Sequence, residues 1–126
     1  MQENLSNVTT GNIRITVLTN EDEYQPVTLE AHKLVFGPRE TDYGHPIDDF
    51  DTFAAYLTTY FRSRHLLAEG AEIIGEDVFP IMNLCKLSRY ANGINVGAPK
   101  RDTNVDVAGY AEAGWRVIDE RGRRDR

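Results

Sequence analysis

The chain has 126 residues, enough for one domain with one core, and its 40% hydrophobic content is ordinary for a globular protein. Its formal net charge of −6 argues against general nucleic-acid binding. No apolar run has the length of a membrane span, so we expect no membrane partner. The single cysteine, Cys85, excludes an intrachain disulfide and favours a cytoplasmic protein.

The N-terminal quarter of the chain predicts a short β-hairpin. Residues 1–11 are polar and are expected to be a flexible lead-in. Residues 12–18 alternate apolar and polar side chains and are rich in β-branched residues, which predicts a strand. After a turn at 20–23, residues 24–27 are expected to return as a second strand, which Pro26 restricts to an edge.

Four helices are predicted from capping residues and from apolar residues at three- and four-residue spacing. They cover residues 29–36, 47–65, 76–92 and 102–122. The third is apolar almost all round, which predicts a buried, central helix. The fold class is therefore mostly α, a four-helix bundle-like domain with a short N-terminal β-hairpin.

The domain is expected to span residues 12–122, followed by a basic tail at 123–126. The four Arg and one Asp of residues 121–126 contribute +3, which leaves −9 on the rest of the chain. Such a tail could contact a phosphate or a partner, or it could be a frayed and solvated helix end.

The connection between the first two helices, residues 37–50, combines Gly and Pro with charged and aromatic side chains. Arg39 could hold a phosphate through two hydrogen bonds, and Tyr43 could stack on a base. His45 could bind a phosphate or relay a proton. This composition suits a loop that faces a ligand better than a plain connector.

Acidic residues near two helix starts are candidate metal ligands. Asp102 and Asp106 are four residues apart, so they project from one helix face, where a divalent cation would relieve their repulsion. Asp77 would be a third carboxylate. The alternatives are that Asp102 and Asp77 serve their helix N-termini and that Asp106 is solvated.

Lys86 and Arg89 interrupt the apolar third helix. A buried cation needs a partner, and Asp102 or Asp106 could supply it. The alternatives are a site that neutralises phosphate, a structural ion pair, or a lysine that extends to solvent along its apolar stem.

Three blocks of residues carry a family resemblance. They are R-x-x-D-Y-G-x-P-x-x-D-F at 39–50, D-V-x-x-x-M-x-x-x-K-x-x-R at 77–89, and D-x-x-x-D-x-A-G-Y at 102–110. Together they resemble a family of small phage-encoded helical proteins of unassigned function. That family is distantly similar to the all-α nucleotide pyrophosphohydrolases of the MazG type.

The resemblance implies a Mg²⁺-dependent reaction in which water attacks a nucleoside triphosphate and pyrophosphate is released. It also implies a homo-oligomer, a dimer or tetramer, in a host bacterial cytoplasm. MazG-type enzymes carry an E-x-x-E pair on one helix and an E-x-x-D pair on the next. This chain has neither in that form, so the metal site would be reorganised or lost.

The expected site consists of metal ligands, catalytic residues and substrate-binding residues. Metal would be held by Asp77, Asp102 and Asp106. The catalytic residues that neutralise phosphate charge would be Lys86 and Arg89. The substrate-binding residues would be Arg39, Tyr43, His45 and Tyr110.

Two other functions fit the same residues. A non-catalytic protein could use the pocket to bind or sequester a nucleotide. A phage interaction or assembly protein could use the charged positions as a structural ion network.

Overall fold

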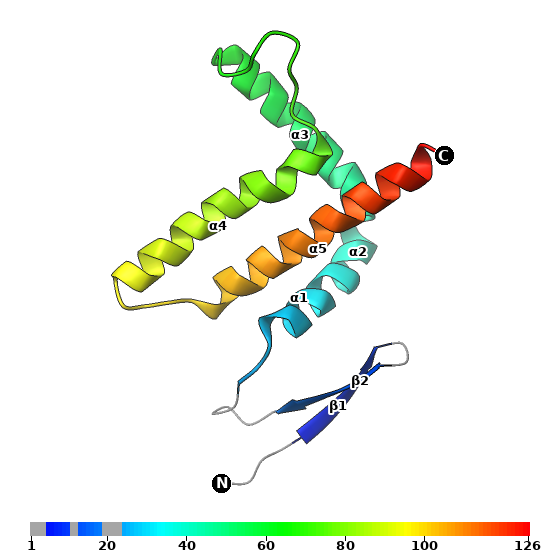
Figure 1. The fold of residues 1–126 in the computed structure, drawn as a ribbon, viewed down its shortest axis with the longest axis vertical. Coiled ribbons are helices and arrows are strands. Elements are labelled where there is room, and N and C mark those ends of the chain that lie inside the picture. Colours follow the sequence, from blue (N-terminus) through cyan, green and yellow to red (C-terminus); the bar gives the residue numbers. More distant parts are fainter. Residues whose placement is uncertain (1–4, 11–12, 19–23) are drawn as a thin grey trace.

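The computed structural model describes residues 5–10, 13–18 and 24–126, which are mostly α-helical, as the sequence predicts (Figure 1). The helices are α1 (Val27–Phe36), α2 (Pro38–Tyr43), α3 (Pro46–Ser63), the short 3-10 helix η1 (Gly75–Asp77), α4 (Val78–Asn95) and α5 (Arg101–Arg124). In this part of the chain, no helix has the length and apolar character needed to cross a membrane.

Two strands precede the helices. Strand β1 (Leu5–Thr10) pairs antiparallel with β2 (Ile13–Leu18). β2 falls within the predicted strand, but its partner is not the one expected, and β1 occupies part of the predicted flexible lead-in. The predicted turn at 20–23 lies outside the described residues.

The expected strand at 24–27 is wrong, because Val27 is the first residue of α1. Pro26 is the residue before that helix and is extended, with φ −61° and ψ 125°. Proline has no N–H to give to a strand ladder, whereas its fixed φ is compatible with the start of a helix.

The connection at 37–50 is more ordered than predicted, because it contains α2 and the first turn of α3. Pro38 occupies the first turn of α2, where a missing N–H costs nothing. Gly44 ends the helix at φ 73°, in the left-handed region that favours glycine. The predicted ligand-facing loop is therefore a helix followed by a short turn.

Helix α3 begins at a histidine cap. The N–H of Ile47 donates to Nδ1 of His45 at 3.1 Å, and Pro46 occupies the first turn. The buried positions of α3 are Ile47, Phe50, Ala54 and Thr58. The Thr58 hydroxyl accepts from the N–H of Ile73 at 2.9 Å, which holds the segment before η1 against α3.

Helix α4 is not the buried central helix that its composition predicts. Within α4, Val78 alone is buried, while Leu84 and Leu87 are 68% and 54% exposed. Among the residues that the structure describes, α4 packs on α5, η1 and α3, so the apolar side of α4 that faces away from them stays in solvent.

The central element is α5, which packs on α1, α3, α4 and η1. Gly114 permits a close approach of α5 to α4, because a Cβ at this position would lie 2.8 Å from Cβ of Phe79 on α4. α5 also continues into the predicted basic tail, as far as Arg124. Arg123 and Arg124 pair with Asp119 and Glu120 at the i, i+4 spacing that supports a helix.

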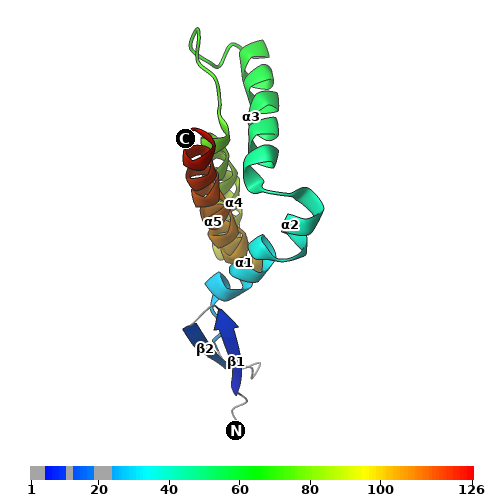
Figure 2. The same ribbon diagram turned by 90° about the vertical axis from the view of Figure 1, so that its right-hand side faces the viewer.

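The core forms where α3, α4 and α5 meet. Its buried members are Ile47, Phe50, Ala54, Val78 and Val117. Two layers result, with α4 and α5 in one and α2 and α3 in the other, while α1 packs on α5 and leads into α2 (Figure 2). The space between the layers beside this core is where the candidate site lies.

Candidate functional site

A cavity of about 250 Å³ lies between the two layers, lined by all five α-helices. Its apolar lining includes Ala31, Leu34, Val35, Phe50, Val105 and Ala113. Its polar lining consists of Arg39, Glu40, Tyr43, Asp49, Lys86, Asp106, Tyr110 and Arg116. An apolar pocket with a few converging polar groups is the usual form of a small-molecule site.

The cavity brings together residues from all three blocks singled out in the sequence. Arg39 and Tyr43 come from the first block, Lys86 from the second, and Asp106 and Tyr110 from the third. They span more than seventy positions of the chain, so only folding makes them neighbours.

The pair of Lys86 and Asp106 ties α4 to α5 at the cavity wall. Lys86 Nζ donates to Oδ2 of Asp106 at 2.9 Å. The lysine side chain is 13% exposed and the carboxylate 43% exposed, so the carboxylate is the more open to the cavity and to water. Of the two partners proposed for Lys86 from sequence, the fold selects Asp106.

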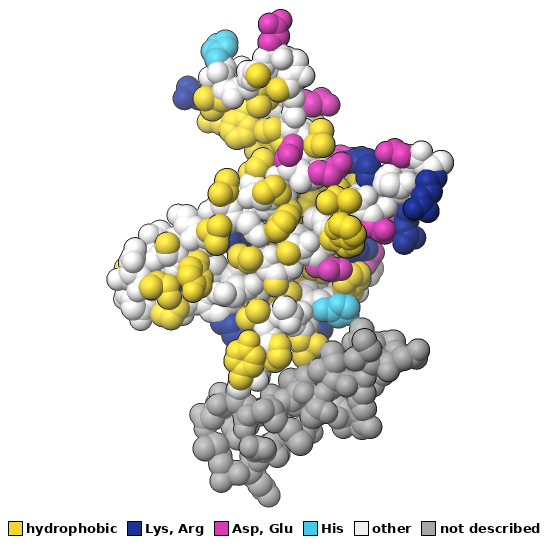
Figure 3. Space-filling view, in the orientation of Figure 1, with side chains coloured by type: hydrophobic (Ala, Val, Ile, Leu, Met, Phe, Trp, Pro, Cys, Tyr) yellow, Lys and Arg dark blue, Asp and Glu magenta, His cyan; other side chains and the backbone are white. Residues whose placement is uncertain are grey.

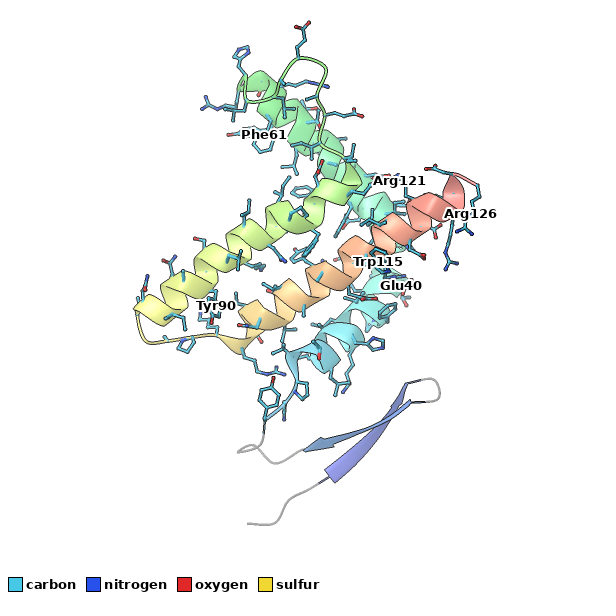
Figure 4. The ribbon with its side chains drawn as sticks, viewed as in Figure 1. Glu40, Phe61, Tyr90, Trp115, Arg121 and Arg126 are labelled. Atoms are coloured by element: carbon cyan, nitrogen blue, oxygen red, sulfur yellow. The ribbon has the colours of Figure 1, made fainter. Side chains whose placement is uncertain are left out.

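A second ion pair was not predicted. Arg116 on α5 donates to Oε1 of Glu40 on α2 at 2.6 Å, and its guanidinium lies 4.6 Å from the ring centroid of Phe36. Figure 4 labels Glu40, which lies beside α5. Both charged residues line the cavity. An arginine among the small and apolar residues of α5 indicates that Arg116 needs a partner. The sequence does not identify Glu40 as that partner, because residues 37–50 are predicted to be a loop.

Arg39 and Tyr43 lie at the mouth of the cavity. The Arg39 guanidinium is 5.7 Å from the centroid of the Tyr43 ring, within the range of a cation–π contact. Tyr43 is 69% exposed. An exposed aromatic ring beside a cation can contact a planar group and an anionic group of the same ligand.

The remaining predicted site residues do not line the cavity. His45 caps α3. The carboxylate of Asp77 accepts the N–H of Ile74 at 2.9 Å, as a helix-start residue does. Asp102 and Arg89 are exposed on α5 and α4.

The three predicted metal ligands are not assembled. Among residues 5–10, 13–18 and 24–126 there is no group of three or more His, Cys, Asp and Glu side chains placed to share a metal ion. The acids that line the cavity are instead Glu40, Asp49 and Asp106. Glu40 and Asp106 accept from Arg116 and Lys86, so this donor set suits a cation held jointly with a ligand's phosphates better than a cation held by protein alone.

A separate ion cluster lies outside this cavity. Arg121 donates to both oxygens of Asp51, at 2.9 and 2.6 Å, and to Glu76 at 2.6 Å. Hydrogen bonding to Arg121 lowers the pKa of Asp51, and the bonds to Asp51 and Glu76 raise that of Arg121. Sequence reasoning placed Arg121 at a frayed helix end and missed this role.

Comparison with known proteins places the chain in a family. Residues 27–118 match the family described as a domain of unknown function, DUF6378, and the chain belongs to it. The match begins at α1 and ends within α5, so it contains every residue that lines the cavity.

A phage protein is among its relatives. The chain is 32% identical over 96 residues to the Gene 55 protein of Mycobacterium phage D29. The aligned stretch covers 76% of this chain and 56% of the relative. The chain thus corresponds to little more than half of that relative's length. No solved structure matches the chain. The predicted kinship with phage proteins of unassigned function is confirmed.

Proposed function

We propose that this protein is a Mg²⁺-dependent nucleotide pyrophosphohydrolase-like enzyme that acts on a nucleoside triphosphate or a related nucleotide. The observation that carries the proposal is the convergence of Arg39, Tyr43, Lys86, Asp106 and Tyr110 on one cavity. The two tyrosine rings suit a base, the two cations suit a phosphate chain, and the carboxylate of Asp106 suits a hydrated Mg²⁺ ion.

Each residue that lines the cavity would contact a different part of the nucleotide. Tyr43 and Tyr110 would hold the base and sugar, and Arg39 would bind a terminal phosphate at the mouth. Asp49 and Asp106 would hold Mg²⁺ together with phosphate oxygens, replacing the predicted set of Asp77, Asp102 and Asp106. When bound, Mg²⁺ would lower the pKa of a water molecule and neutralise charge.

Lys86 would act from the cavity wall. In the free protein it pairs with Asp106, and with a nucleotide bound it would also neutralise charge on the phosphate chain. Arg89 lies outside the cavity, so we assign it no catalytic role.

The size of the cavity favours a particular pose. About 250 Å³ is slightly below the roughly 300–1,000 Å³ that is usual for small-molecule pockets. One part of a nucleotide would fill it, and the phosphates would extend past Arg39 toward solvent.

The test is thermal unfolding of the full chain with nucleoside mono-, di- and triphosphates, each with and without Mg²⁺. Ligand at 100 times its Kd stabilises by about 2.7 kcal/mol, a rise of several degrees in Tm. Release of pyrophosphate from the stabilising nucleotide would then be measured. We expect Tyr43→Ala to abolish the rise, whereas the control Tyr24→Ala, at a residue 78% exposed and away from the cavity, should keep it.

The outcomes separate the three functions. A Mg²⁺-dependent rise in Tm with turnover supports the enzyme. A rise without turnover supports a nucleotide-binding or sequestering protein with the same pocket. The absence of any rise would reject both.

An interaction or assembly protein is the candidate favoured by a different observation. Ion pairs connect α4 with α5, α2 with α5, and α3 with α5, which is the network a structural role would need. For all three functions we propose a homo-oligomer, because the apolar side of α4 is uncovered in one chain. We also propose that the protein acts in the host cytoplasm.

A further inference from the structure

One face of the α4–α5 layer is both apolar and open. Leu84, Leu87, Ala91 and Ile94 recur along α4 at three- and four-residue spacing, and all four are exposed. Charged residues make up 27% of the chain, yet α4 contains only Lys86 and Arg89. Neither falls in this row.

Helix α5 has a matching row. Val107, Ala111, Trp115 and Ile118 recur at four-, four- and three-residue spacing. Trp115 is 64% exposed and Ile118 49% exposed. The row contains no charge, although α5 as a whole is rich in acidic and basic residues.

The two rows lie on the same side of the molecule. Each row is on the side of its helix away from the core cluster, to which α4 contributes Val78 and α5 contributes Val117. Those two valines belong to a single core cluster, so both rows point away from it. Apolar side chains accordingly gather over α4 and α5 on the side seen in Figure 3. We call these eight residues the outer face.

The accessible surface is larger than one compact chain requires. It measures 9240 Å², against about 6,800 Å² expected from surface–mass scaling at 14.3 kDa. Part of the excess belongs to β1 and β2, whose contacts are with each other. A dimer contact of standard size would bury roughly 800 Å² of each partner, which is less than this difference.

The character of the outer face favours a second copy of the same chain as its occupant. Each chain carries a net charge of −6, and an uncharged face lets two such chains meet without placing like charges opposite each other. The face is also self-complementary in size. The large side chains Leu84 and Leu87 on α4 could fit over the small Ala111 on α5 of a two-fold related copy.

We propose that two copies of this chain form a two-fold dimer by packing their outer faces against each other, α4 and α5 of one against α4 and α5 of the other. The cavity between the layers lies on the opposite side of α4 and α5, so the dimer contact leaves its mouth open. The proposal does not depend on any enzymatic activity.

Sedimentation equilibrium of the full chain over a range of concentrations tests the proposal. We expect a mass of about twice 14.3 kDa that falls toward 14.3 kDa on dilution. Leu84→Glu and Leu87→Glu, tested singly, should each give a monomer at every concentration, because a buried unpaired carboxylate is costly. Tyr24→Glu, at an exposed residue outside the outer face, should leave the dimer intact.

Trp115 provides a second readout within the folded protein. It is the only tryptophan, and it would pass from largely exposed to buried on dimerisation. Its emission should be blue-shifted in the dimer and should move to the red on dilution, with unchanged far-UV circular dichroism. A wild-type monomer at all concentrations would overturn the proposal and would indicate that a different protein covers the outer face. A dimer that survives both glutamate substitutions would also overturn it.

Discussion

Lys86 on α4 and Asp106 on α5 form an ion pair at 2.9 Å, although twenty positions separate them in the chain. The pair closes one wall of the cavity and joins two antiparallel helices. Its lysine is nearly buried and its carboxylate is half open. A structural and a ligand-binding role are therefore both available to the same two residues.

Removing the carboxylate from this pair should weaken the fold moderately. Asp106→Asn leaves the ammonium of Lys86 without its anion, and we expect a loss of about 1–2 kcal/mol in the free energy of unfolding. The cost stays moderate because Asp106 is 43% exposed and water can replace part of the interaction. Denaturant unfolding measures it, with Asp102→Asn on the same helix as control.

The same variant also bears on function. If Asp106→Asn remains folded but no longer gives a Mg²⁺-dependent nucleotide response, Asp106 acts at a ligand site. A protein that fails to fold at all would instead assign the pair a structural role.

A methyl group at Gly114 should be poorly tolerated. Its Cβ would lie 2.8 Å from Cβ and 3.0 Å from Cγ of Phe79, so α4 and α5 would have to separate. We expect Gly114→Ala to cost about 1–3 kcal/mol in thermal or chemical unfolding, the usual range for overpacking.

Gly109→Ala is the matched control on the same helix. Its nearest neighbour would be Cγ2 of Val35 at 3.7 Å, an ordinary contact. The higher helix propensity of alanine should then stabilise the protein by up to about 1 kcal/mol. Equal destabilisation by both substitutions would contradict the close approach at Gly114.

Acid should weaken the Arg121 cluster. The pKa of Asp51 is lowered in the folded protein by its hydrogen bonds to Arg121. The unfolded chain therefore binds a proton more readily, and the pair contributes stability that is fully present above about pH 4. That contribution is lost as the pH falls through the lowered pKa.

Tm measured against pH checks this prediction. Below about pH 4 the wild-type protein should lose Tm more steeply than Asp51→Asn, which has no carboxyl group to titrate. Asp125→Asn, at the exposed end of the chain, should retain the wild-type slope. Parallel curves for all three proteins would show that Asp51 is not linked to stability.

His45 should be replaceable only by residues that can cap a helix. Its Nδ1 accepts the N–H of Ile47 at the start of α3. We expect His45→Ala to lower the free energy of unfolding by about 0.5–2 kcal/mol, and His45→Asn to retain most of it, because an asparagine side chain also accepts from the first turn. Equal losses in the two variants would argue against capping.

Local sequence signals located most of the helical segments. Apolar spacing, Pro46 and the cap residues predicted α1, α3, α4 and α5 within a few residues of their observed bounds, because these signals act within one or two turns. The same signals missed α2, a helix of one and a half turns surrounded by Gly and Pro. They also ended α5 too early at Gly122, because the supporting ion pairs of Arg123 and Arg124 were not weighed.

The sequence by itself determined which residue types this protein has available for chemistry, and where its four longer helices lie. Only the tertiary structure decided which of them meet. It brought Lys86 to Asp106, turned Asp77 and His45 into helix-start residues, and made α5 the central helix instead of α4. The physical reason is that a helix's pattern shows that it has an apolar side, whereas the neighbour that covers that side depends on how the helices pack.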